Sequence, residues 1–334
     1  MQSRFEQSDS RPRVIRIGGW NPTLVLGQFA GIVLIYFLFL SCGVPETLFS
    51  IDNTKLVLVQ TVIVGVGALG MTLVIISGGI DLSVGSVIAL ASVTTALVYK
   101  GSASISLSVL AGIATGALVG FLNGIMVVGL RIVPFIATLG TLGIARGVAK
   151  IVAGEQTVNP PLSRLADLMS IQWRTPLWVL PSGVWVMLAL ALLVGFLLRF
   201  TVFGRYVYAI GSNEPTARLC GVPVDLCKVG IYSICGALTG VSGVLIFGQL
   251  TIGDPTVAVG KELDIIAATV IGGGSLSGGE GSVLGSLIGA FIMTLLRSGC
   301  QKMGWPNPVQ EIAIGAIIIL AVTIDQVRHR RSSR

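Results

Sequence analysis

Ten apolar segments separated by short polar links constrain this chain more than any other sequence feature. A helix of about 20 residues crosses the roughly 30 Å hydrocarbon core of a bilayer, because it rises about 1.5 Å per residue. Of the 334 residues, 53% are hydrophobic and 11% are charged, whereas about a quarter of the residues in soluble domains are charged. The sequence therefore predicts an all-α integral membrane protein with about ten transmembrane helices. The expected segments are 24–43, 56–76, 84–99, 105–130, 132–153, 177–198, 229–250, 263–273, 283–298 and 309–325.

Two of these segments, 84–99 and 263–273, are too short to cross a bilayer easily. Each adjoins a glycine-rich polar stretch, at 77–85 and at 272–282. Irregular backbone at membrane depth persists only where protein or a water-filled cavity satisfies its polar groups. We therefore expect broken or re-entrant helices beside a transport path. The alternative is that these helices simply begin outside the membrane.

The distribution of basic residues predicts the orientation of the segments. With ten crossings, both ends of the chain lie on one side, and this side holds 13 of the 22 Lys and Arg residues against six on the other. Positive charge is enriched on the cytoplasmic side, so we expect the N- and C-termini there. The expected parts are a basic N-terminal arm over 1–23, a single transmembrane domain over 24–325 and a basic C-terminal tail over 326–334. The longest external loop is then 154–176.

The net charge of +7 comes from the ends and the loops of the chain rather than from one continuous face. Basic flanks of this kind indicate contact with anionic membrane lipid and do not indicate a nucleic-acid partner. Arg146 and Lys150 lie one helical turn apart near the end of an apolar segment. We expect both side chains to extend to the outer interface.

The link 203–222 is more polar than the two long apolar runs that flank it. Gly211 is suited to the turn into a helix, Asn213 to the cap at its start, and Gly221 to the position after its end. The pattern predicts a short helix over 214–220, about two turns long. Such a helix between two membrane spans offers a surface to a partner in the aqueous phase. The alternative is a solvated loop that happens to carry capping residues.

Asp81 is the most informative single residue, because a carboxylate near membrane depth is costly unless it is paired or hydrated. It can be capped locally by Ser83 and the start of the next helix, or it can be a gate or path residue. Asn123 is likewise either a buried structural amide or a path residue. It lies beside a stripe of glycines that recur every four residues and predict close packing of two helices. These are Gly112, Gly116, Gly120 and Gly124.

No pattern in the chain indicates chemistry on a substrate. The sequence GVGALG at 65–70 matches a dinucleotide fingerprint formally, but it lies inside an apolar span without the strand and acidic residue that such a site needs. The chain has no Walker A sequence, and its five cysteines lack metal-ligand spacing. We expect no catalytic residues, no metal and no cofactor. If transport is driven by ATP, the ATPase is another polypeptide.

The link described above also resembles a known motif. The sequence GRYVYAIGSNEPTARLCGV resembles the cytoplasmic motif of ribose-type permeases, the membrane subunits of bacterial ABC importers for monosaccharides. The resemblance continues in family order over most of 56–325. The further matching sequences are SGGIDLSVGS (77–86), FLNG (121–124), PFIATLGTLGIARG (134–147) and TVIGGGSLSGGEGSVLGSLIGA (269–290). The departures are Thr216 in place of an alanine, Cys220 where serine is common, and the additional glycine Gly274.

The resemblance implies a type II ABC importer-like permease that forms the translocation path for ribose or a related monosaccharide. It implies a multi-pass protein of the bacterial inner membrane that pairs with a second permease copy or a paralogue. Cytoplasmic ABC ATPase subunits would dock on 203–222, and a periplasmic or lipid-anchored sugar-binding protein would dock outside. We expect that protein to contact 154–176, because this is the only long external loop and it lacks the pattern of a span. The ATPase-coupling residues would be Gly204, Arg205, Tyr208, Ala209, Gly211, Asn213, Ala217, Arg218 and Gly221. The residues of the path or gate would be Gly79, Asp81, Ser83, Asn123, Gly273 and Ser275.

Three other functions have to be weighed against this interpretation. A secondary transporter driven by a proton or sodium gradient would use Asp81 or Asp264 as its ion site and would need no ATPase. An ABC permease for a vitamin or an amino acid would share the architecture but not the sugar-type motifs. A membrane scaffold without transport would not need the broken helices. The sequence alone does not distinguish ribose from other pentoses and hexoses.

Overall fold

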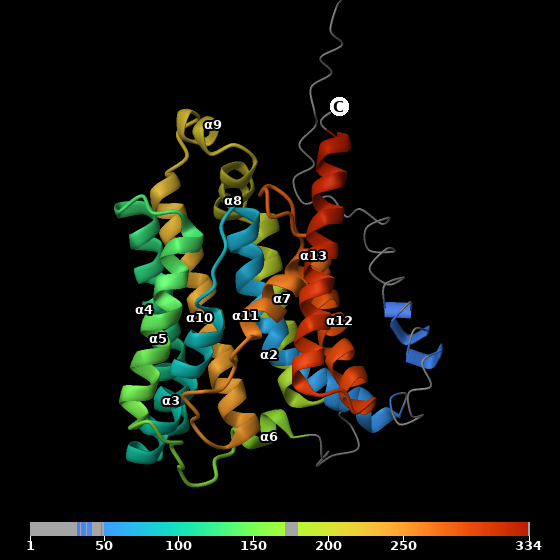
Figure 1. Cartoon of the computed structure of the whole chain (residues 1–334). Helices are drawn as coiled ribbons and strands as arrows, with labels where there is room; N and C mark the ends of the chain where they lie inside the picture. The colour runs from blue at the N-terminus through green and yellow to red at the C-terminus, as the bar shows by residue number, and fades with distance from the viewer. Residues whose placement is uncertain are drawn as a thin grey trace, which may run out of the picture.

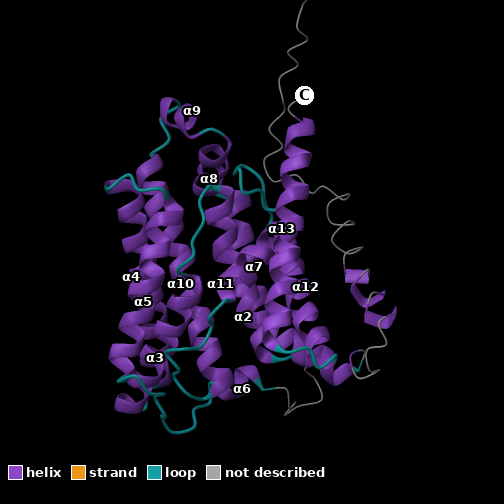
Figure 2. Ribbon diagram, in the orientation of Figure 1, coloured by secondary structure: helices purple, strands orange, loops and turns teal. Residues whose placement is uncertain are grey.

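The described part of the chain consists of helices and their connections (Figures 1 and 2). The computed structural model describes residues 32–33, 35–37, 39–41 and 48, and then 50–170 and 180–332. Within these ranges the only extended pairing is an isolated antiparallel bridge between Val158 and Gly253. The helices are α2 (Ile51–Ile76), α3 (Val84–Ser102), α4 (Ile105–Gly129), α5 (Pro134–Ala153), α6 (Ala166–Met169), α7 (Ser182–Phe200), α8 (Val202–Ser212), α9 (Glu214–Leu219), α10 (Val224–Leu250), α11 (Lys261–Ile271), α12 (Val283–Lys302) and α13 (Asn307–Ser332).

The expected all-α membrane fold is confirmed. Seven described helices, α2 to α5, α7, α10 and α12, are long and apolar enough to cross a membrane. Nine of the ten expected segments correspond to a helix. Most of the tenth segment, 24–43, lies outside the described residues, and the part that is described is helical. The arm 1–23 also lies outside them, and α13 continues through the expected tail to residue 332. The number of crossings remains a prediction.

Helix α2 forms the centre of the bundle. Its apolar window is 94% buried, whereas the corresponding window of α4 is 22% buried. Helices α7, α10, α11 and α12 pack around α2. A helix that is apolar on every side needs such a place, since it has no polar face to offer to water. The low burial of α4, α5 and α7 gives the bundle the apolar outer surface expected beside lipid.

The glycine stripe of α4 packs against α10, as the spacing predicts. A side chain at Gly116 would meet Gly240 of α10 at 2.7 Å and would collide with the Gly236 carbonyl. Gly236 in turn would collide with the Gly116 carbonyl if it carried a Cβ. The two backbones are therefore in direct contact, which is possible only because both sides of the contact are glycine.

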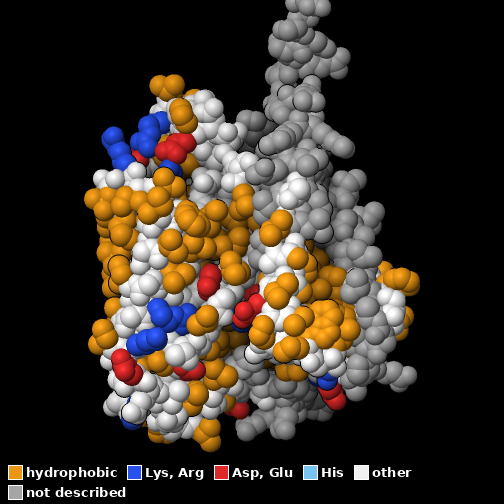
Figure 3. All heavy atoms as spheres, viewed as in Figure 1, with side chains coloured by type: hydrophobic (Ala, Val, Ile, Leu, Met, Phe, Trp, Pro, Cys, Tyr) orange, Lys and Arg blue, Asp and Glu red, His pale blue; other side chains and the backbone are white. Residues whose placement is uncertain are grey.

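Charged side chains are unevenly spread over the face drawn in Figure 3. Some gather at the end where α9 lies, above a broad hydrophobic band, and others lie below that band. The described end of α13 lies at the same end as α9, and α6 lies at the opposite end (Figure 1).

Two connections interrupt the bundle at the predicted breaks. Residues 77–83 leave α2 beside α8 and run along α10 into the bundle, where α3 begins (Figure 2). Residues 272–282 form the turn between α11 and α12. Helix α11 has only 11 residues, about 16 Å at 1.5 Å per residue, which is roughly half of a bilayer core. The predicted non-helical breaks are confirmed, and the first lies within the packed helices.

Candidate functional site

The polar link 203–222 folds into two consecutive helices, α8 and α9. The predicted caps of α9 are confirmed: Asn213 Oδ1 accepts a hydrogen bond of 2.9 Å from the Thr216 amide, and Gly221 follows the helix with φ of +81°. The helix ends at Leu219, one residue earlier than expected. Sequence reasoning missed α8, which is amphipathic and buries Val207 and Ile210. Both helices lie at one end of the bundle (Figure 1).

The expected role of Gly211 was wrong. We expected this glycine to allow a turn into α9, but it lies within α8 and has helical geometry. A side chain there would collide with the carbonyl of Ile76 at the end of α2 and would lie 2.6 Å from the amide of Gly279. The residue is glycine because three backbone segments meet at this point. Residue 211 therefore joins α8 to both interrupted regions of the bundle.

Tyr208 provides a second link from α8 to the turn 272–282. Its hydroxyl donates a hydrogen bond of 3.0 Å to the Gly281 carbonyl. The other predicted coupling residues lie on the same two helices. Gly204 is buried against the end of α7, Arg205 is exposed, Ala209 is half-buried and Ala217 is buried in α9. The structure thus assembles the predicted coupling residues into one α8–α9 unit.

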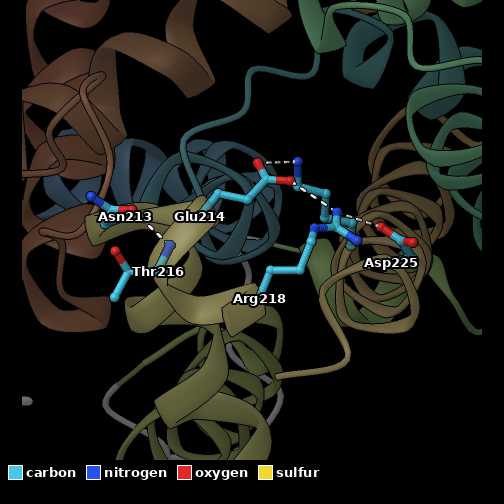
Figure 4. A network of polar contacts seen from close by, with 6 residues as sticks. Asn213, Glu214, Thr216, Arg218 and Asp225 are labelled. Carbon is cyan, nitrogen blue, oxygen red and sulfur yellow. Dashed lines mark hydrogen bonds and ion pairs between the residues drawn. The ribbon is translucent and has the colours of Figure 1, made fainter. Parts of the chain in front are cut away.

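A chain of ion pairs attaches α9 to the first turns of α10 (Figure 4). Arg218 Nη2 lies 3.2 Å from Glu214 Oε1 and 2.7 Å from Asp225 Oδ1. Lys228 Nζ lies 2.7 Å from Glu214 Oε2. We expected Arg218 to serve a partner, yet it already binds two carboxylates of its own chain. Sequence reasoning missed the contacts with Asp225 and Lys228. The Glu214–Arg218 ion pair could have been predicted, because residues four positions apart lie on the same face of a helix.

The surroundings of Glu214 favour its ionised form. Burial opposes this ionisation, but the hydrogen bonds and positive charges of Lys228 and Arg218 outweigh it. Together they lower the pKa of Glu214 below its ordinary value of 4.5. Because these side chains are partly exposed, each pair contributes on the order of 0.2–1 kcal/mol to stability. The network therefore orients α9 more than it stabilises the fold.

Three of the predicted path residues are joined by hydrogen bonds inside the bundle. Asp81 Oδ1 accepts hydrogen bonds from the amide and the hydroxyl of Ser83, at 2.9 and 2.6 Å. The Ser83 hydroxyl accepts one from Asn123 Nδ2 at 2.9 Å. All three residues are buried, and no described Lys or Arg forms an ion pair with Asp81. The local cap that the sequence suggested for Asp81 therefore forms, and its role in transport stays a prediction.

The remaining path candidates lie at two different places. Gly79 faces Tyr232 of α10, since a side chain at 79 would meet the tyrosine hydroxyl at 2.5 Å. That hydroxyl is buried and has no hydrogen-bond partner among the described residues. Gly273 and Ser275 belong to the turn 272–282, where Gly273 has φ of +87° and Ser275 is buried. Sequence reasoning missed Tyr232, which reads locally as an ordinary apolar position.

Asp264 forms an internal salt bridge. Its two carboxylate oxygens each accept a hydrogen bond of 2.8 Å from the guanidinium of Arg297 in α12. Lys261 adds a contact of 3.2 Å. The Asp264 side chain is 1% exposed, and bidentate pairing of this kind satisfies a buried carboxylate. This residue fixes α11 to α12.

Comparison with known proteins places the chain in a family. Residues 53–322 match the family model described as the branched-chain amino acid transport system / permease component. The chain belongs to this permease family. The permease is 38% identical to the ribose import permease protein RbsC of Escherichia coli K12, over 90% of its own length and 94% of that protein's. It is 33% identical to the L-arabinose permease AraH of Azospirillum brasilense, over 96% and 93%. It is 36% identical to the fructose import permease FrcC of Rhizobium meliloti, over 83% and 79%. No solved structure matches it significantly.

The predicted external loop of the permease is described only up to residue 170. Residues 171–179 lie outside the described residues, and Arg174 is among them. The described part contains α6 and the bridge to Gly253. Arg146 Nη1 donates hydrogen bonds to the carbonyls of Pro255 and Val257, so this side chain is held by the connection between α10 and α11. Lys150, one turn later, is exposed. The extension of both side chains to the outer interface stays a prediction.

Proposed function

We propose that this permease is the membrane subunit of an ATP-driven importer and forms the path for a monosaccharide. ATP is hydrolysed by separate cytoplasmic subunits that dock on α8 and α9, and a sugar-binding protein delivers the substrate at the opposite end. The protein acts with a second copy or a paralogue in the bacterial inner membrane, with both termini in the cytoplasm. It has no catalytic residue of its own in this scheme.

One observation carries the coupling part of this proposal. Helix α8 contacts the end of α2 and the turn 272–282 through Gly211 and Tyr208, while α9 is capped and tied to α10 by charged side chains. A surface at the end of the bundle is therefore connected by direct contacts to both interrupted regions. A partner that displaces α9 also displaces the breaks, which is the physical requirement for coupling between two sites.

The named relatives support a sugar as the substrate. They import ribose, L-arabinose and fructose, which are neutral monosaccharides whose hydroxyl groups need hydrogen-bond partners but no counter-charge. The described interior fits such a substrate, because its buried polar residues are mostly Ser and Thr and Asp264 is neutralised by Arg297 and Lys261. The same pairing disfavours Asp264 as the ion site of a gradient-driven transporter. Branched-chain amino acids, which the family description names, are the competing substrates.

The test uses proteoliposomes that contain the permease, its ATPase and its sugar-binding protein. Uptake of ribose, arabinose, fructose and leucine is measured with ATP and with an ion gradient instead of ATP. We expect ATP-dependent uptake of at least one of the sugars. Uptake driven by a proton or sodium gradient without ATP, or ATP-dependent uptake of leucine alone, would contradict the proposal.

The role of α9 is tested with the variant Asn213→Ala/Arg218→Glu. Losing the cap costs about 0.5–2 kcal/mol of local helix stability, and the charge reversal breaks the contacts to Glu214 and Asp225. Insertion should stay normal, while stimulation of ATP hydrolysis by the binding protein and sugar uptake should both fall. The matched control Asn213→Asp/Arg218→Lys keeps the cap acceptor and the charge and should retain activity. If the first variant keeps stimulated hydrolysis and uptake, α9 has no part in coupling.

A further inference from the structure

The connection between α10 and α11, residues 251–260, is bonded to the predicted external loop. The Val158 amide donates to the Gly253 carbonyl at 2.8 Å, and the Gly253 amide donates back to the Val158 carbonyl at 2.9 Å. Gly253 also packs tightly on α3, because a side chain there would meet Ala96 at 2.6 Å and the backbone of Val93 at 3.1 Å. A displacement of the external loop near Val158 is therefore passed to this connection.

Arg146 of α5 holds the same connection from another side. Its Nη1 donates to the Pro255 carbonyl at 2.9 Å and to the Val257 carbonyl at 2.7 Å. Hydrogen bonds from a charged donor are stronger than those between neutral groups. The two bonds span three consecutive residues and leave little freedom between Gly253 and the start of α11. The connection is thus held at both of its halves.

Helix α11 continues from this connection toward α8. Its first turn is fixed to α12 by the Asp264–Arg297 pair, and its last residue leads into the turn 272–282. In that turn the Gly279 amide donates to the Ile76 carbonyl at 2.8 Å, next to Gly211 of α8. Figure 1 shows α11 in the middle of the bundle, between its connection to α10 and the turn beside α8.

We propose that α11 and its two connections transmit to α8 the displacement that a partner causes when it docks on the outside. In this proposal Arg146 is the positioning residue at the outer end. This inference rests on the proposed function, because it needs a partner at each end. The two connections of α11 make backbone contact with the external loop at one end and with α8 at the other. Without Arg146, the connection 251–260 would absorb a displacement rather than pass it on.

The experiment compares Arg146→Ala with Lys150→Ala in proteoliposomes that contain the ATPase. Lys150 lies one turn away on α5 and is exposed, so its variant controls for loss of charge. The binding protein is added loaded with ribose, arabinose or fructose in turn. For Arg146→Ala we expect the ratio of stimulated to unstimulated ATP hydrolysis to fall about fivefold or more, the lower end of usual coupling strengths. Arg146→Lys, which keeps one charged donor, should give an intermediate ratio, and Lys150→Ala should match wild type.

A second measurement separates positioning from a merely structural role. Amide hydrogen exchange in α8 should change when the loaded binding protein docks on the wild type, and should not change in Arg146→Ala, although the binding protein still docks. Gly253→Val, which would collide with α3, should show the same uncoupling. This variant replaces Arg146→Ala in the experiment if Arg146→Ala does not insert into the membrane. Full stimulation in both variants, or loss of stimulation only because docking is lost, overturns the inference. If no binding protein stimulates even the wild type, the proposed function fails instead.

Discussion

The contact between α4 and α10 predicts a specific cost for the substitution Gly116→Ala. The added methyl group would lie 2.7 Å from Gly240 Cα and would overlap the Gly236 carbonyl. Carbon atoms prefer separations of about 3.5–4.0 Å, so the two helices have to move apart by roughly 1 Å. Enlarging a side chain in a well-packed core costs about 1–3 kcal/mol. Alanine also favours the helix over glycine by about 0.8–1 kcal/mol, which partly offsets the steric cost.

The matched control is Gly195→Ala in α7, where no atom lies near the position of the new methyl group. It gains the same helix preference without the collision, so the difference between the two variants isolates the steric cost. We expect Gly116→Ala to be less stable than Gly195→Ala by about 1–3 kcal/mol. Reversible unfolding by SDS in mixed micelles measures both free energies of unfolding. If the two variants differ by less than about 0.5 kcal/mol, the usual range for uncrowded surface sites, the close backbone contact is wrong.

Two further predictions concern Asp81 and Glu214. Asp81→Ala removes the carboxylate that orients Ser83 and Asn123, so sugar uptake should fall while insertion and dimer formation stay normal; full uptake in proteoliposomes would exclude Asp81 from the path. The lowered pKa of Glu214 means that its ionised form stabilises the attachment of α9. This contribution is fully present above the ordinary value of 4.5 and is lost as the pH falls through the lower pKa of the folded state. A nitroxide on the exposed Cys220 should therefore gain motion on acidification from pH 7 to about 3. Glu214→Gln should show a smaller response, because only Asp225 then remains to titrate against Arg218, and equal pH responses in both proteins would show that Glu214 does not hold α9.

Several features could be predicted from the sequence because their causes are local. The apolar segments depend on length and composition alone, and the cap of α9 joins residues only three positions apart. The glycine stripe of α4 follows from helical periodicity, which places every fourth residue on one face. The two breaks follow from runs of glycine between short apolar segments. In each case the residues that cause the feature lie within a turn or two of one another along the chain.

Only the tertiary structure decided which residues contact one another across the bundle. The sequence shows Asp264 and Arg297 33 positions apart and Arg146 109 positions from Pro255, and no periodicity joins positions so far apart. Gly211 reads as a turn residue because glycine favours turns, yet it is required by the backbone of α2 and of the turn 272–282. Tyr232 reads as one more apolar position until Gly79 lies against its hydroxyl. A local pattern specifies where a helix lies and which face it buries, but the neighbour on that face is chosen by packing, which depends on every other helix at once.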